Sequence, residues 1–442
     1  MKLKTTILTG VSALAMSSAA YAADLPVVAE PVNYVKACDA FGNAFFQLPG
    51  TDTCLSIGGQ VRVQIMSGNL MDNDDDEDAT DYSAYGRGRL WVDTMTAADF
   101  GTIATYAGFY YSWNDEASGD PKSDDAYIQL NLNSGVDMTF GYTSSIYSGF
   151  TGYAWMAPGG ADWSDNSALL AALKVPVGPL TFGVSVEDAS YTSSGDQVNA
   201  IGSLEFDQGM FSFKVSGAYV DNADLDFTMQ EAVERKPIFN EAGDTVTGWT
   251  PAIAEEKLTG DVDAGYAFNA NTEISPTDTL TFGLGVQYGQ GAPSYTGLFF
   301  SEYDIEGALK GATNAAGDAP IENADVWAGG ADELFRAANG TSLGVMGGVS
   351  LDLSEEVSLM VEGSYTQWDA SYEAVSIEGT GTMVGTSLVW RPAAGLGIAL
   401  TAGYSTYDFE GVDLQGDGAA DDVSFSSTKE SANIGTRIQY TF

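Results

Sequence analysis

Apolar and polar residues alternate with a period of two along most of the chain. In SANIGTRIQYTF, residues 431–442, the residues Ile434, Ile438, Tyr440 and Phe442 share one parity, and those between them are small or polar. A period of two places the two sets on opposite faces of a β-strand. The segment therefore predicts a strand with one apolar face.

Similar segments recur from residue 55 onward, and we count about 16 of them, an even number. They are residues 55–68, 85–93, 101–113, 126–132, 136–143, 168–175, 180–188, 201–206, 210–220, 258–268, 279–289, 342–353, 357–368, 381–390, 396–409 and 431–442. Short connections alternate with long ones. The long ones are residues 69–80, 114–124, 144–166, 188–197, 222–257, 290–340, 369–380 and 410–430.

Short turns on one rim and long loops on the other are typical of a transmembrane β-barrel. Lipid offers no hydrogen-bond partners, so the sheet must close. The pattern predicts an all-β fold, a transmembrane antiparallel barrel of about 16 strands with short periplasmic turns and long extracellular loops. The apolar face of the last strand then contacts lipid, with Tyr440 and Phe442 near the interface. A secreted β-sandwich or a repetitive adhesin is the alternative, but it does not explain the alternating connections.

The first residues are typical of an export signal. Lys2 and Lys4 precede an apolar run that ends in Ala20-Tyr21-Ala22. We expect a signal peptide over 1–22, an N-terminal periplasmic segment over 23–54, and the barrel over 55–442. An ordinary N-terminal helix is the alternative. Export and the barrel pattern together predict a multi-pass protein of the bacterial outer membrane.

Composition excludes several classes of function. The formal net charge is −44, from 17 Lys and Arg against 61 Asp and Glu, which argues against nucleic-acid binding. The chain has no His, so a Ser-His-Asp or Cys-His catalytic arrangement is impossible. We expect no enzymatic activity and no cofactor. Cys38 and Cys54 are the two cysteines, and in an oxidising compartment we expect a disulfide between them, with two free thiols as the alternative.

One segment has a spacing similar to a calcium loop. DLQGDGAADD, residues 413–422, places Asp413 and Asp417 as candidate ligands. An EF-hand would need Glu at the twelfth position and flanking helices, whereas Ser424 stands there between strands. The segment is a weak candidate, and we expect no other metal site.

Three segments carry a resemblance to a known family. They are YVKACDAFGNAFFQLPGTDTCLSIGGQVRV (residues 34–63), YGRGRLWVDTMTAADFGTIATY (85–106) and AYIQLNLNSGVDMTFGYTSSIYSGF (126–150). They resemble the alphaproteobacterial, Rhizobiales-type, outer-membrane porin family. The resemblance implies a homotrimer of 16-stranded barrels whose third loop folds into the lumen. Ala104 departs from it, because a longer polar or basic side chain is expected there.

Charges of both signs are predicted to face the lumen. By parity they are Arg62, Arg87, Arg89, Lys174, Lys214 and Arg437, with Asp93, Asp137, Glu187, Asp261, Asp263, Asp352 and Glu362. If the third loop (144–166) folds inward as the resemblance implies, Asp162 and Asp165 form the acidic side of a constriction. Arg62, Arg87 and Arg89 then form the basic side. Five aromatic residues are expected to anchor the loop: Tyr147, Phe150, Tyr153, Trp155 and Trp163.

These features predict a passive, water-filled porin for ions and small hydrophilic solutes. We expect outer-membrane lipid and lipopolysaccharide as its surroundings. Acidic loops such as residues 71–81 concentrate cations, so we expect a cation preference. Alternatively, these acids are only a solvated surface that binds divalent cations. The alternative functions are a substrate-specific channel, for sugars for example, and an adhesin or receptor barrel that acts through loops 222–257 and 290–340.

Overall fold

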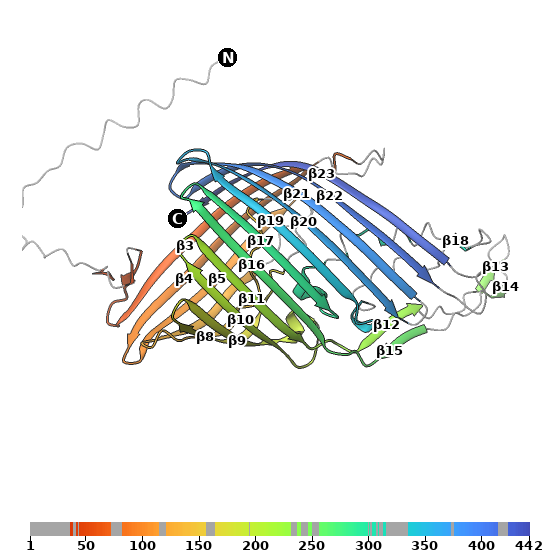
Figure 1. Cartoon of the computed structure of the whole chain (residues 1–442), viewed down its shortest axis with the longest axis horizontal. Helices are drawn as coiled ribbons and strands as arrows, with labels where there is room; N and C mark the ends of the chain where they lie inside the picture. The colour runs from red at the N-terminus through yellow and green to blue at the C-terminus, as the bar shows by residue number, and fades with distance from the viewer. Residues whose placement is uncertain are drawn as a thin grey trace, which may run out of the picture.

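The computed structural model describes residues 36–442 apart from 39–40, 43, 72–81, 115–120, 156–163, 194, 231–236, 240–245, 250–255, 299, 301–302, 306–307, 309–312, 315–334, 373–374 and 414–422. Its main element is a sheet of 19 strands, of which β1, β2 and β18 are short additions. The other 16 strands are antiparallel neighbours, and the last, β23, pairs with the first, β3. The sheet is thus a closed barrel, with strands tilted along its wall (Figure 1).

The wall strands follow one another in chain order. They are β3 (Thr53–Ser67), β4 (Tyr82–Ala98), β5 (Gly101–Asn114), β6 (Lys122–Leu132), β7 (Asp137–Ser144), β8 (Ser167–Val177), β9 (Leu180–Asp188), β10 (Val198–Gln208), β11 (Phe211–Val220), β16 (Gly265–Thr277), β17 (Leu280–Gln290), β19 (Thr341–Asp352), β20 (Val357–Tyr372), β21 (Val375–Ala393), β22 (Leu396–Asp413) and β23 (Val423–Thr441).

The outer face of the wall is apolar, as the alternation predicts. On β3, Ile57, Val61, Val63 and Ile65 expose 46–56% of their surface. Ile434, Ile438, Tyr440 and Phe442 are likewise exposed at the closing strand. So many large apolar side chains facing outward around a barrel form the lipid-contacting band of an outer-membrane protein. No helix in the described part of the chain is long and apolar enough to cross a membrane.

Tight turns join the strands at one rim. Two residues connect β4 to β5, and two connect β8 to β9. The other rim carries the long connections, and β12 to β15 and β18 lie at this end, away from the C terminus (Figure 1). Between β11 and β16, β12 (Leu225–Gln230) pairs with β15 (Glu256–Gly260), and β13 (Pro237–Phe239) pairs with β14 (Val246–Trp249).

The predicted strand over 258–268 was wrong in position. β15 ends at Gly260, the wall strand β16 begins at Gly265, and the tight turn lies at 278–279. The polar run NANTEISPTD, residues 269–278, was predicted as the connection between two strands, but most of it belongs to β16. In a barrel, asparagines on the inner face meet polar groups while Phe268 and Ala270 face outward, so the strand continues.

The predicted long connection over 369–380 was also wrong. β20 runs to Tyr372 and β21 begins at Val375, so the two strands extend beyond the apolar pattern. The connection over 410–430 shortens to residues 414–422 for the same reason. Strands that rise above the bilayer no longer need an apolar outer face, so alternation underestimates their length.

The N-terminal segment is tied to the first wall strand. β1 (Lys36–Ala37) pairs with β2 (Phe46–Gln47), and β2 pairs with the start of β3. Cys38 and Cys54 form the predicted disulfide, with an S–S distance of 2.02 Å. Because Cys54 is itself part of β3, the disulfide fastens this segment directly to the wall.

Candidate functional site

Four arginines form a basic patch on the inner face where the barrel closes. Arg62 on β3 lies opposite Arg87 on β4 and opposite Gln439 on β23. Arg437 lies two residues before Gln439, and Arg89 lies two residues after Arg87 on β4. We call Arg62, Arg87, Arg89 and Arg437 the arginine strip. The structure thus brings together the three arginines predicted for the basic side and adds Arg437 to them.

Arg89 differs from the rest of the strip because it has a carboxylate partner. It forms an ion pair with Asp124 on β6 and donates to the hydroxyl of Tyr106 over 2.8 Å. Tyr106 in turn donates to Asp124 over 3.0 Å and stacks on Tyr127. Sequence reasoning missed Asp124 because residues 114–124 were assigned to a connection, whereas β6 begins at Lys122.

The third loop lies between β7 and β8, and its described residues, 145–155 and 164–166, fold into the barrel as the resemblance implied. Its first residues are pinned to the wall by buried polar groups. The Ser145 hydroxyl donates to Glu187 on β9 over 2.7 Å, and Lys214 on β11 donates to the Ser148 carbonyl over 2.5 Å. Asn269 on β16 donates to the Tyr147 carbonyl over 2.8 Å, and Tyr147 is fully buried.

The loop continues along the wall as far as β22. Glu362 on β20 accepts from the backbone N–H groups of Tyr153 and Ala154, over 2.5 and 2.7 Å. The Trp155 N–H donates to the hydroxyl of Ser387 on β21 over 3.0 Å. Backbone donors with no helix or sheet partner are thus satisfied by wall side chains, which is what a folded-in loop requires.

Glycines on the wall make room for the loop's aromatic rings. Phe150 lies against Gly283 on β17, and Trp155 lies against Gly397 on β22. A β-carbon at either glycine would overlap the ring, so only glycine permits these contacts. Gly397 pairs with Gln439, which holds Arg62, so the ring of Trp155 lies beside the arginine strip.

Two predicted lumen acids hold loops instead of facing water. Glu187 is fully buried and Glu362 is 4% exposed. Parity placed both on the inner face correctly, but the third loop covers them. Asp261 and Asp263 lie between β15 and β16, outside the wall strands where the sequence placed them.

Described residues of a second long loop also lie inside the barrel. In the connection between β17 and β19, η3 (Pro293–Thr296) places Tyr295 in a fully buried position, edge-on to Tyr147. Tyr295 donates to Glu187 over 2.8 Å, and Asn166 of the third loop donates to the Ser294 carbonyl over 2.9 Å. Burial raises the pKa of both tyrosine hydroxyls, so they remain protonated near neutral pH.

The same loop packs an aromatic cluster against the inner wall near the long-loop rim. Its buried members are Leu298, Tyr303, Ile305, Ala308 and Phe335 from the loop, with Trp368, Ala370, Ile377, Tyr407, Phe409 and Phe425 from β20 to β23. The described residues of this loop therefore fill part of the barrel mouth. Sequence reasoning treated residues 290–340 as an external loop, because the buried residues show no strand or helix period.

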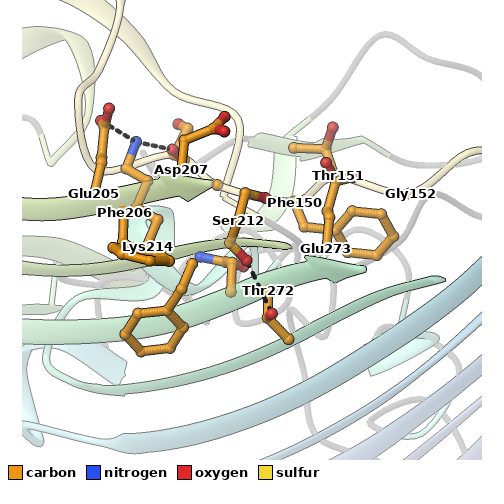
Figure 2. Close-up of a pocket in the computed structure, with 14 residues that line it drawn as sticks. Phe150, Thr151, Gly152, Glu205, Phe206, Asp207, Ser212, Lys214, Thr272 and Glu273 are labelled. Atoms are coloured by element: carbon orange, nitrogen blue, oxygen red, sulfur yellow. Dashed lines mark hydrogen bonds and ion pairs between the residues drawn. The ribbon is translucent and has the colours of Figure 1, made fainter. Parts of the chain in front are cut away.

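A cavity of about 410 Å³ remains between the third loop and the wall (Figure 2). Loop residues Ser148 to Gly152 form one side, and β10, β11 and β16 form the other. Lys214 lies between Glu205 and the loop, and Glu205 also pairs with Lys174. The charges in this part of the wall are therefore largely compensated within the protein.

The acidic side of the predicted constriction is only partly described. Asp162 and Trp163 lie outside the described residues, and Asp165 is exposed, close enough to Asp125 for the two carboxylates to repel. Of the calcium candidates, Asp413 is the last residue of β22, and Asp417 lies outside the described residues. The described part of the chain contains no cluster of three side chains able to hold a metal ion.

Comparison with known proteins agrees with this architecture. Two curated relatives are Porin Omp2a of Brucella ovis, 32% identical over 171 residues, and Porin Omp2b of Brucella abortus (strain 2308), 36% identical over 167 residues. Each match covers 35% of this chain, and it spans 49% of the first relative's length and 44% of the second's.

Two solved structures share the fold. The outer-membrane channel DcaP of Acinetobacter baumannii aligns with a TM-score of 0.55 at 12% identity, over 88% of this chain and 97% of that one. OmpT of Vibrio cholerae in its trimer form aligns with a TM-score of 0.50 at 13% identity, over 89% of this chain and 100% of that one. The sequence profile of the Porin subfamily matches residues 24–436, nearly the whole chain, and the chain therefore belongs to that family.

Proposed function

We propose that this chain is a passive, water-filled channel of the outer membrane for ions and small hydrophilic solutes. One observation carries the proposal: the described part of the third loop lies along β9 to β22 inside a closed barrel, while Arg62, Arg89 and Arg437 find their polar partners on the wall itself. The loop is held against one side of the barrel, and the wall on the other side is polar and half-exposed. The space between them is a narrowed aqueous path. Passive diffusion through such a path requires no bond chemistry, so the proposal is of a channel and not an enzyme.

Single-channel recording of the refolded mature chain in a planar bilayer tests the proposal. We expect stepwise conductance that persists without any added ligand. Insertion without current would contradict an open channel. A chain refolded after reduction, with both cysteines alkylated, is a useful control, because the disulfide lies outside the path and its loss should leave the conductance per channel unchanged.

We further propose a cation preference for small ions. It rests on the formal net charge of −44, with acids concentrated in connections such as residues 71–81. Under a salt gradient, the reversal potential should have the sign of cation selectivity. Replacing Asp74, Asp75 and Asp76 by asparagine should move it toward zero, more at low salt than at high salt. An unchanged potential would make these acids a solvated surface only.

For the constriction itself, we propose that Asp162 and Asp165 oppose Arg62, Arg87 and Arg89 across the path. The exposure of Asp165 and the half-exposure of the arginines support this arrangement. A cysteine at position 162 or 165 should react with a small thiol reagent from the lumen and reduce the current. Modification without any change in current would place these residues outside the path.

Assembly as a homotrimer is also a proposal for this chain. The trimeric Vibrio cholerae protein with the same fold supports it. Light scattering of the protein in detergent should give three chains per particle, and a single chain per particle would contradict it.

A surface-receptor role is the second candidate function. The paired strands β12–β15 and β13–β14 form small hairpins at the long-loop rim, where a partner could reach them. The connection after β17 supports this role less, because its described residues pack inside the mouth. Deleting residues 231–255 should leave conductance intact if the chain is only a channel, whereas loss of cell binding in that variant would establish the receptor role.

A further inference from the structure

Three arginines of the strip lie close together, and repulsion between their like charges destabilises the fold. Arg62 and Arg87 lie directly opposite each other on neighbouring strands, and like charges in that position destabilise a sheet. Arg437 lies on the neighbouring strand β23, two residues before Gln439, which pairs with Arg62. Among the described residues, no carboxylate pairs with any of these three. We call Arg62, Arg87 and Arg437 the open triad.

Neutral amides, and not acids, hold two of the three. Arg62 donates its Nε–H to Gln439 over 3.0 Å and an Nη2–H to Gln60 over 3.3 Å. Arg437 donates its Nε–H and an Nη2–H to Gln64, over 3.1 and 2.7 Å. An amide oxygen orients a guanidinium without neutralising it. Each guanidinium has five N–H donors, so several on each side chain remain for a ligand.

Arg87 is held differently, by aromatic rings. Its guanidinium lies 4.3 Å from the ring centre of Tyr110 and 5.3 Å from that of Tyr85. Its Nε atom is buried without a hydrogen-bond partner in the described structure. Cation–π contacts fix the group in place and leave its hydrogen-bond donors unused.

Three other cations of the lumen wall have carboxylate partners. Arg89 pairs with Asp124, while Lys174 and Lys214 share Glu205. The chain has 61 acidic residues for 17 basic ones, so acids were abundantly available. Yet glutamines stand at positions 60, 64 and 439, where glutamates of nearly the same size would have neutralised the open triad.

We infer that the open triad is a binding subsite for small oxyanions that carry two or more negative charges, such as a di- or tricarboxylate or a phosphate. Guanidinium groups bind carboxylate and phosphate oxygens in a bidentate manner, and three of them on adjacent strands suit a multiply charged solute. The inference rests on the proposed channel, because the ligand reaches the subsite through the lumen. A path that otherwise prefers cations would then contain one specific binding site for oxyanions.

Blockade by anions in a planar bilayer tests the subsite. Citrate, inorganic phosphate and, as a neutral probe, sucrose are each added to one side at constant ionic strength. We expect citrate and phosphate to interrupt the current and sucrose not to do so. Citrate alone would assign the subsite to carboxylates, and equal blockade by phosphate would assign it to oxyanions in general. Blockade by neither would overturn the inference.

Variants with matched charge changes separate a local site from general electrostatics. Arg437→Gln and Arg62→Gln should each weaken citrate blockade about tenfold, the loss expected when a charged hydrogen-bond donor is removed. Lys174→Gln removes the same charge from β8, away from the open triad, and should change the blockade less than twofold. Equal effects in all three variants would overturn the inference.

A measurement without current distinguishes failure of the subsite from failure of the channel. Titration calorimetry of the detergent-solubilised protein with citrate should show binding that Arg62→Gln weakens, even if no conductance is found. Absence of current with citrate binding intact would overturn the proposed function and leave the subsite standing. Current without citrate binding would overturn the subsite and leave the proposed channel standing.

Discussion

The two sides of the inner wall differ in whether their charged side chains are buried and paired. From β9 to β22 described loop residues pack against the wall, and its acids Glu187 and Glu362 are buried and accept hydrogen bonds from these residues. Across β23, β3 and β4 the wall is half-exposed, and three of its four arginines have no carboxylate partner among the described residues. Charge on the covered side holds loops to the wall, while most of the charge on the open side is not neutralised by described residues.

Burial explains the difference. A carboxylate without water must be satisfied by hydrogen bonds, so Glu362 accepts two backbone N–H groups. A guanidinium at the edge of an aqueous path is partly hydrated and tolerates the absence of a partner. Substitutions on the covered side should therefore change stability and pore width, and substitutions on the open side should change selectivity.

The largest effect is expected for Glu362→Ala. The variant leaves the backbone N–H groups of Tyr153 and Ala154 unsatisfied and should release the middle of the third loop, at a cost of about 3 kcal/mol. Single-channel conductance should rise, and liposome-swelling assays should admit larger sugars. Glu362→Gln keeps one acceptor oxygen and should fall between wild type and the alanine variant. Unchanged conductance in both variants would mean that the loop does not narrow the path.

A smaller effect is expected for Tyr295→Phe. Tyr295 connects the two inward loops, because it packs on Tyr147 and donates to Glu187. Loss of the hydrogen bond to buried Glu187 should lower the free energy of unfolding by about 2 kcal/mol. Thermal unfolding in detergent measures it. Tyr191→Phe is the control, because Tyr191 is 54% exposed and its loss should cost less than about 0.5 kcal/mol. Equal losses of unfolding free energy in both variants would mean that Tyr295 does not anchor the loops.

Alkaline pH should act on the same contact. Burial raises the pKa of Tyr147 and Tyr295 above the usual value of about 10. A raised pKa in the folded state means that the stabilising contribution is complete below pH about 10 and is lost as pH rises through the folded pKa. Unfolding free energies should therefore fall as the pH rises above about 10, and less so in Tyr295→Phe. An identical slope in the variant would contradict the assignment.

The smallest effect on stability, and one of opposite sign, is expected for Arg87→Gln. Removing one of two like charges that lie opposite each other should stabilise the barrel by about 0.5 kcal/mol. The reversal potential should at the same time shift toward stronger cation selectivity. Salt should abolish the stability gain because it screens the repulsion. A destabilised Arg87→Gln barrel would show that the open side is structural after all.

Much of the fold follows from local pattern. Alternation identified the strands of the wall, their outward faces and the closing strand, because lipid imposes the same apolar requirement on every outer position. Parity also identified Arg62, Arg87, Arg89 and Arg437 as inward residues, and a cysteine count identified the disulfide. The pattern failed where strands leave the bilayer, as at β20 and β21, since that requirement ends there.

What lies against each inward residue was decided only by the tertiary structure. Parity cannot tell Glu362, covered by the third loop, from Arg62, which is held by wall glutamines, because both are simply inward. Nor can it show that Tyr295 meets Glu187 across 108 residues of sequence. The path of a loop depends on the sum of many contacts with distant strands, and no repeat in its own sequence encodes that sum. By itself the sequence determined the barrel and its charges; the folded loops determined which of those charges are buried.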